Sequence, residues 1–94
     1  MIMVRHYLMV AKEQEIDALK AALEALREKV TPLPGCLGAY IYQDQAKPER
    51  FFFLERWESA EAQKAGGAAL GKEAFAPIMA ALACPPDGCS LSPI

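Results

Sequence analysis

The sequence contains one histidine, His6, in a position that suits proton transfer. Apolar residues alternate along the N-terminal stretch, which places His6 on one face of a strand with Val4, Leu8 and Val10. A neutral imidazole there can accept the proton of a phenol or hydroquinone, and the resulting electron-rich anion can pass an electron to dioxygen. The same position also suits a structural histidine that is hydrogen-bonded to a neighbour in the core. The sequence is compatible with both interpretations.

A carboxyl group lies among aromatic residues further along the chain. Glu55, Trp57 and Phe53 share one face of a second strand, because side chains on a strand repeat every two residues. Glu55 is either an acid with a raised pKa that orients a polar group of a substrate or the partner of a basic group in a buried ion pair with Arg5 or Arg56. Trp57 either stacks on a flat substrate or fills the core where the strand meets a helix.

Three tyrosines, Tyr7, Tyr40 and Tyr42, carry phenols that can hold a substrate oxygen or simply bury their rings. From these residues we take His6 and Trp57 as the candidate catalytic residues. The candidate substrate contacts are Phe53, Glu55, Phe75 and Tyr40.

Nothing in the sequence indicates a metal or an organic cofactor. Cys84 and Cys89 could form a disulfide or half of a metal site, but no second Cys or His pair lies near them. Gly66 and Gly67 lack the strand and lysine of a phosphate-binding loop, and no flavin or nicotinamide motif is present. The odd number of cysteines excludes a complete disulfide framework, so we expect a cytoplasmic protein and, for Cys36, simple packing.

Charge and composition limit the partners. Ten Lys and Arg against twelve Asp and Glu give a net charge of −2 without a basic run, which argues against nucleic acid and anionic membranes. Hydrophobic residues make up 53% of the 94 residues, and the mean hydropathy is +0.08. We therefore expect one domain over residues 1–94, with part of its apolar surface covered by another subunit.

The sequence predicts four strands and three helical segments. Alternation predicts strands over residues 2–11, 36–44 and 50–58, and a three-to-four-residue apolar repeat predicts a helix over 16–30. Ser59 is a suitable N-cap for a short helix over 60–65, which Gly66 and Gly67 should weaken, with a loop over 68–71. A second helical run over 72–83 carries Phe75, Ile78, Met79 and Leu82 on one stripe, and a last strand spans 89–94.

This order predicts an α+β fold, a ferredoxin-like βαββαβ plait with an antiparallel sheet and helices on one face. The run of three Phe at residues 51–53 indicates that both faces of its strand are covered. One cover is helical, and the open face of the sheet is the expected surface for a homodimer.

Three stretches carry a resemblance to a known family: Pro34-Gly35-Cys36-Leu37, Pro48 followed by Arg50-Phe51-Phe52, and the stretch Phe53-Leu54-Glu55-Arg56-Trp57-Glu58-Ser59-Ala60-Glu61-Ala62. Together they resemble the antibiotic biosynthesis monooxygenase family of dimeric α/β barrels, from Met1 to about Leu82. The resemblance implies a homodimer with face-to-face sheets and a pocket in each subunit between sheet and helices. Family members oxidise quinols, anthrones or similar aromatics with dioxygen and no added cofactor, and another branch degrades haem.

The sequence departs from the family pattern at Gly66, where many relatives carry a histidine, and no histidine lies on the final helix for haem iron. The leading hypothesis is a cofactor-independent monooxygenase that oxidises a small electron-rich aromatic, with His6 as base and Trp57 and Phe53 as walls. The alternative, which Gly66 favours, is a non-catalytic dimeric ligand-binding or assembly module. An isomerase that uses His6 to move protons is third, and haem degradation is last.

Overall fold

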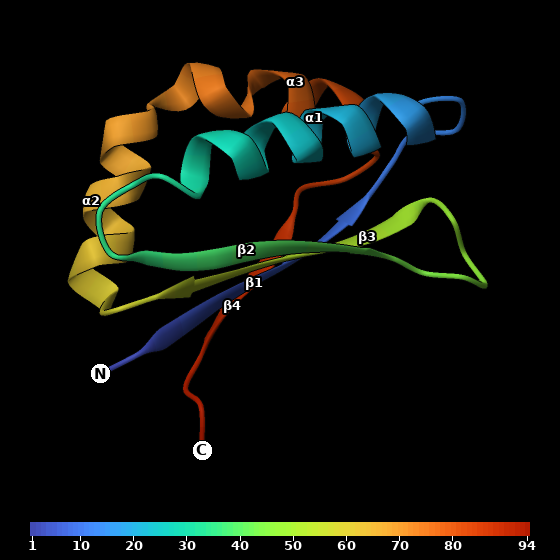
Figure 1. Ribbon diagram of the computed structural model, residues 1–94. Coiled ribbons are helices and arrows are strands. Elements are labelled where there is room, and N and C mark those ends of the chain that lie inside the picture. Colours follow the sequence, from blue (N-terminus) through green and yellow to red (C-terminus); the bar gives the residue numbers. More distant parts are fainter.

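A four-stranded antiparallel sheet, in the order β2-β3-β1-β4, forms one layer of the molecule, and helices cover one of its faces (Figure 1). The computed structural model describes residues 1–94. Its elements are β1 (Met3–Val10), α1 (Ile16–Val30), β2 (Cys36–Gln43), β3 (Arg50–Trp57), α2 (Ala60–Leu70), the 3-10 helix η1 (Lys72–Phe75), α3 (Ala76–Ala81) and β4 (Asp87–Leu91). This order confirms the predicted α+β ferredoxin-like plait. None of the helices is both long and apolar enough to cross a membrane.

Helix α1 anchors the core against the sheet. Its apolar repeat buries Leu19, Leu23, Leu26 and Val30, as the periodicity predicts. The sheet contributes the aromatic side of the core, in which Phe51, Phe53 and Trp57 are almost completely buried. The largest buried side chains are Trp57, Phe51, Phe53, Leu19, Leu23, Ile78 and Val30.

The register between β1 and β3 decides which side chains share a face. Met3 pairs with Trp57, Arg5 with Glu55, Tyr7 with Phe53 and Met9 with Phe51. These side chains all point toward the helices, because Phe51, Phe53 and Trp57 lie in the core under them. The opposite face carries Val4, His6, Leu8, Tyr40, Tyr42, Phe52, Leu54, Arg56, Cys89 and Leu91, and we call it the open face.

Helix α2 is longer than the sequence predicts. Ser59 caps it as expected, because its side-chain oxygen accepts a hydrogen bond of 3.1 Å from the backbone N–H of Ala62. The glycine pair at 66 and 67 does not end the helix, which continues to Leu70, so the predicted loop over 68–71 is wrong. Packing outweighs the low helix propensity of glycine here, because Gly66 is buried against Trp57.

The C-terminal part also differs in detail. The predicted helical run over 72–83 is divided into η1 and α3, and Pro77 lies in the first turn of α3, where its missing N–H has no partner to lose. Ile78 is buried, but Met79 is 54% exposed and does not share its stripe. The last strand is Asp87–Leu91 rather than 89–94.

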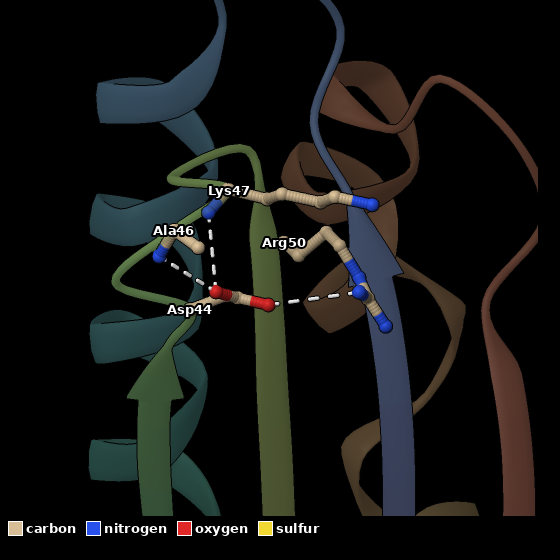
Figure 2. Close-up of polar contacts among 4 residues, drawn as sticks. All are labelled: Asp44, Ala46, Lys47 and Arg50. Atoms are coloured by element: carbon tan, nitrogen blue, oxygen red, sulfur yellow. Dashed lines mark hydrogen bonds and ion pairs between the residues drawn. The ribbon is translucent and has the colours of Figure 1, made fainter.

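The loop between β2 and β3 is held by its own side chains (Figure 2). Asp44 accepts hydrogen bonds from the backbone N–H groups of Ala46 and Lys47, at 2.8 and 3.1 Å, and forms an ion pair of 3.5 Å with Arg50. The bond from Ala46 is the largest cause of a lowered pKa at Asp44. This turn sets the start of β3, and hence the placement of the residues that follow on that strand.

Candidate functional site

Glu55 is the one buried charged residue of the core, with 6% of its surface exposed. Its carboxylate accepts a hydrogen bond of 3.0 Å from the indole N–H of Trp57, two residues along the same strand. Trp57 is itself 1% exposed, so the bond lies in an apolar, poorly hydrated environment. The pair therefore has a fixed geometry on the helix-covered face of the sheet.

Burial raises the pKa of the Glu55 carboxyl above its ordinary value, and the Trp57 bond and the charge of Arg5 only partly oppose this. The expected ion pair of Glu55 with Arg5 or Arg56 is not present. The chain's ion pair joins Arg50 to Asp44, and Arg56 lies on the open face. Glu55 is thus a carboxyl group with increased basicity, which suits a group that accepts a proton.

Arg5 and Tyr7 extend this polar cluster along β1. The Nε of Arg5 donates to the Tyr7 hydroxyl at 3.1 Å, and an Nη1 hydrogen bond of 3.0 Å joins Arg5 to the hydroxyl of Ser90 on β4. The guanidinium also lies 4.9 Å from the centre of the Tyr7 ring. Both side chains are half-buried and Ser90 is exposed, so this part of the cluster is open to solvent.

The helices leave the β1 and β4 half of this face less covered. Helices α1 and α2 pack chiefly on β2 and β3, and every residue of β4 is exposed. The three surface hollows of the chain are lined by other residues, and neither Glu55 nor Trp57 borders one. A ligand of this site would therefore rest on Tyr7, Arg5 and Ser90, beside the buried Glu55 and Trp57 pair.

The structure brings together only some of the residues proposed from the sequence. Phe53, Glu55 and Trp57 lie together on the helix-covered face, and Phe75 packs, partly buried, against the same core. His6 does not join them.

The open face holds the other two proposed residues, His6 and Tyr40. The ring of His6 lies 5.7 Å from that of Phe52, and its Nδ1 is 4.0 Å from the Cys89 sulfur. Tyr40 is 40% exposed. The sheet separates these side chains from Trp57, so the expectation of one pocket lined by both His6 and Trp57 is wrong.

All three cysteines are free, so Cys84 and Cys89 form no disulfide. Burial raises the pKa of the Cys36 thiol, in keeping with the packing role expected for it. No group of three or more metal-ligating side chains is present.

Comparison with known proteins adds the family. The model of the antibiotic biosynthesis monooxygenases matches residues 1–66, a segment that contains Arg5, Tyr7, Phe53, Glu55 and Trp57 but neither Phe75 nor Ser90. The chain belongs to the antibiotic biosynthesis monooxygenase family. The family expected from the stretches around Cys36 and Trp57 is thereby confirmed, and at family level the chain is placed among monooxygenases.

Solved structures of antibiotic biosynthesis monooxygenases have the same fold. A protein from Nitrosomonas europaea, described as a candidate member, matches with a TM-score of 0.89 and 20% identity over 98% of both chains. A similarly described protein from Chloroflexus aurantiacus matches with a TM-score of 0.84 and 26% identity, over 100% of this chain and 94% of that one. No curated protein matches the sequence.

The packing of Gly66 against Trp57 can be tested by substitution in this member of the family. A Cβ at Gly66 would lie 2.5 Å from the Trp57 ring, whereas a Cβ at Gly67 would meet nothing within 4 Å. Gly66→Ala should therefore lower the free energy of unfolding by about 1–2 kcal/mol through overpacking. Gly67→Ala should raise it by up to about 1 kcal/mol, because alanine favours the helix.

Urea unfolding followed by the fluorescence of Trp57, the one tryptophan, measures both changes. Equal stabilisation by the two alanines would contradict close packing between α2 and Trp57.

Proposed function

We propose that the chain oxidises a small electron-rich aromatic, such as a quinol or anthrone, with dioxygen and without an added cofactor. The observation that carries the proposal is the buried Glu55 carboxyl, fixed by Trp57 and raised in pKa, beside the half-exposed pair of Tyr7 and Arg5. The family supports the oxidation class, and these residues supply the proton chemistry.

Tyr7, Glu55 and Trp57 have different roles toward the bound substrate. The Tyr7 hydroxyl accepts from Arg5, so its own hydrogen is free to donate to a substrate oxygen. Glu55 is the diagonal neighbour of Tyr7 across the β1 and β3 pairing, and such neighbours lie about 7–8 Å apart, within reach of one small aromatic. Glu55 takes the proton of the bound phenol or anthrone, and Trp57 keeps the carboxylate oriented.

The anion that forms supplies all the electrons of the reaction. It passes one electron to dioxygen, and the two resulting radicals combine to form a carbon–oxygen bond. Loss of water then leaves the quinone, so that one oxygen atom of dioxygen enters the product and the other leaves as water. For an anthrone, substrate plus dioxygen gives the anthraquinone plus water, with no other reductant.

Dioxygen uptake tests the proposal directly. The purified chain, without added flavin or metal, is mixed with a small panel of hydroquinones and anthrones in an oxygen electrode, and boiled protein corrects for autoxidation. We expect uptake above the boiled control and a quinone product. We expect the His6→Ala variant to retain this uptake, because His6 lies behind the sheet.

Loss of uptake in a folded His6→Ala variant would indicate that the reaction takes place on the open face, and it would contradict the assignment of the site to Glu55. Absence of uptake over the whole panel would contradict the oxidation itself.

A second candidate, a non-catalytic ligand-binding or assembly module, is favoured by Gly66. This residue lets α2 pack directly on the indole ring of Trp57, where many relatives carry a histidine. Under this function a redox-inert aromatic binds and shifts the thermal midpoint, while the panel above gives no uptake.

We also propose that two chains associate through the open face. It presents Val4, Leu8, Phe52 and Leu54, all only half-buried, together with exposed apolar side chains including Tyr40, Tyr42 and Leu91. Contiguous apolar surface of this kind marks an association site. Light scattering at micromolar concentration should give about twice the chain mass of 10.3 kDa, and a mass near 10.3 kDa would contradict the dimer.

A further inference from the structure

We propose that Arg5 binds a carboxylate carried by the aromatic ligand of this site. The inference rests on the proposed function for the aromatic part of the ligand and adds the charge that the ligand carries. The guanidinium group of Arg5 has hydrogen-bonding capacity that the chain leaves unfilled.

Arg5 is a cationic side chain that forms no ion pair within the chain. Its two hydrogen bonds go to neutral hydroxyls, those of Tyr7 and Ser90. A guanidinium has five N–H donors, so three have no protein acceptor. The nearest carboxyl across the strand, Glu55, is bonded to Trp57 and makes no ion pair with Arg5.

The orientation of the guanidinium is fixed before any ligand arrives. Two residues hold it: Tyr7, through the bond from Nε and through its ring 4.9 Å away, and Ser90, through the bond from Nη1. An ordered planar fork of N–H donors matches a carboxylate and costs little further ordering on binding. The guanidinium of Arg5 is thus preorganised to bind an anion, whereas a surface arginine samples many orientations in solvent.

Gly88 on β4 leaves room beside this group. A Cβ at that position would lie 2.9 Å from Nη2 of Arg5 and 3.0 Å from the Tyr7 ring. A side chain at this position would crowd the guanidinium and the Tyr7 ring, so Gly88 lets Arg5 and Tyr7 pack closely over β4. Nη2 donates no hydrogen bond within the chain, so its donors are available to a ligand.

The position of Arg5 also fits the proton step. Arg5 lowers the pKa of Glu55 through its charge, and a carboxylate bound to Arg5 would neutralise that influence. The bound anion would thus make Glu55 a stronger base at the moment when the aromatic ligand is beside it.

Two redox-inert probes of equal shape test the charge preference: 2-naphthoate and its neutral amide, 2-naphthamide. Isothermal titration with the full chain should give a dissociation constant about tenfold lower for the acid than for the amide. Arg5→Gln should reduce this ratio to about one, and Arg5→Lys, which keeps the charge but loses the fork, should leave an intermediate ratio. Arg27→Gln makes the same change of charge on helix α1, away from Arg5 and from the open face, and should leave the ratio unaltered.

Equal affinities of the two probes for the native chain would overturn the proposal, as would a ratio unchanged in Arg5→Gln or no binding of either probe at millimolar concentration. Circular dichroism verifies that Arg5→Gln is folded. If that variant is unfolded, the ratio of the two affinities in Arg5→Lys tests the proposal instead. Because neither probe is oxidised, the binding result is independent of turnover. Selective binding of the acid without any dioxygen uptake would contradict the proposed oxidation but support carboxylate binding at Arg5.

Discussion

The Glu55→Gln variant is expected to lose about 10²–10⁴-fold of the dioxygen uptake rate while remaining folded. An amide has nearly the shape of the carboxyl and its oxygen still accepts the indole N–H of Trp57, but it cannot take a proton. The loss should appear in the maximal rate rather than in the affinity for substrate. Glu58→Gln, an exposed change on the same segment, is the matched control.

The same variant should be more stable than the native chain at neutral pH. Burial raises the pKa of Glu55 in the folded chain above its ordinary value of 4.5, so the folded state holds the proton more tightly than the unfolded state does. The stabilisation from this proton is complete below the ordinary value and is lost as the pH rises through the raised one. Glutamine has no such loss.

Thermal melts of both proteins at about pH 4 and about pH 8 measure this difference. The native chain should lose stability relative to the variant between the two pH values. A Glu55→Gln protein that is less stable than the native chain at high pH, or fully active, would contradict the assignment of Glu55 as a buried base.

Phe53→Ala should cost about 3–5 kcal/mol of the free energy of unfolding. Phe53 is completely buried, two residues before Glu55 on the same face of β3 and opposite Tyr7 on β1. Alanine at this position would leave a cavity under the helices. Domains of this size have only about 5–15 kcal/mol in total, so a large share of the stability would be lost. Urea unfolding at fixed protein concentration measures the change.

Met79→Ala is the control for this prediction. Met79 is equally apolar but 54% exposed, and its removal should change stability by no more than about 0.5 kcal/mol. Similar losses in both variants would mean that the core does not lie between β3 and the helices as described.

Much of the fold follows from local patterns in the sequence. The apolar repeat over 16–30 defines α1 residue for residue, because one face of a helix must be buried along its whole length. Helix α2 was harder to delimit. A glycine pair lowers helix propensity, and only the close approach of Trp57 to Gly66, a contact between distant segments, explains why the helix continues.

The candidate site was predictable in part. Alternation correctly groups Glu55 with Phe53 and Trp57 within one strand, but it does not say which face of β1 they meet. That depends on the pairing register, and a shift of one residue would place His6 instead of Arg5 beside Glu55. The opposite charges of Arg5 and Glu55 were the available indication, because such pairs favour facing positions. Nothing in the sequence pointed to Ser90.

Strand β1 runs through the middle of the sheet, and its consecutive residues serve different surfaces. Arg5 belongs to the candidate ligand site, and His6 belongs to the open face through which we propose that two chains meet. The two surfaces therefore lie on opposite faces of the same strand. By thermodynamic reciprocity, if a ligand at Arg5 strengthens association by some factor, association strengthens binding of that ligand by the same factor. Substitutions in β1 accordingly need two measurements, one of ligand affinity and one of assembly.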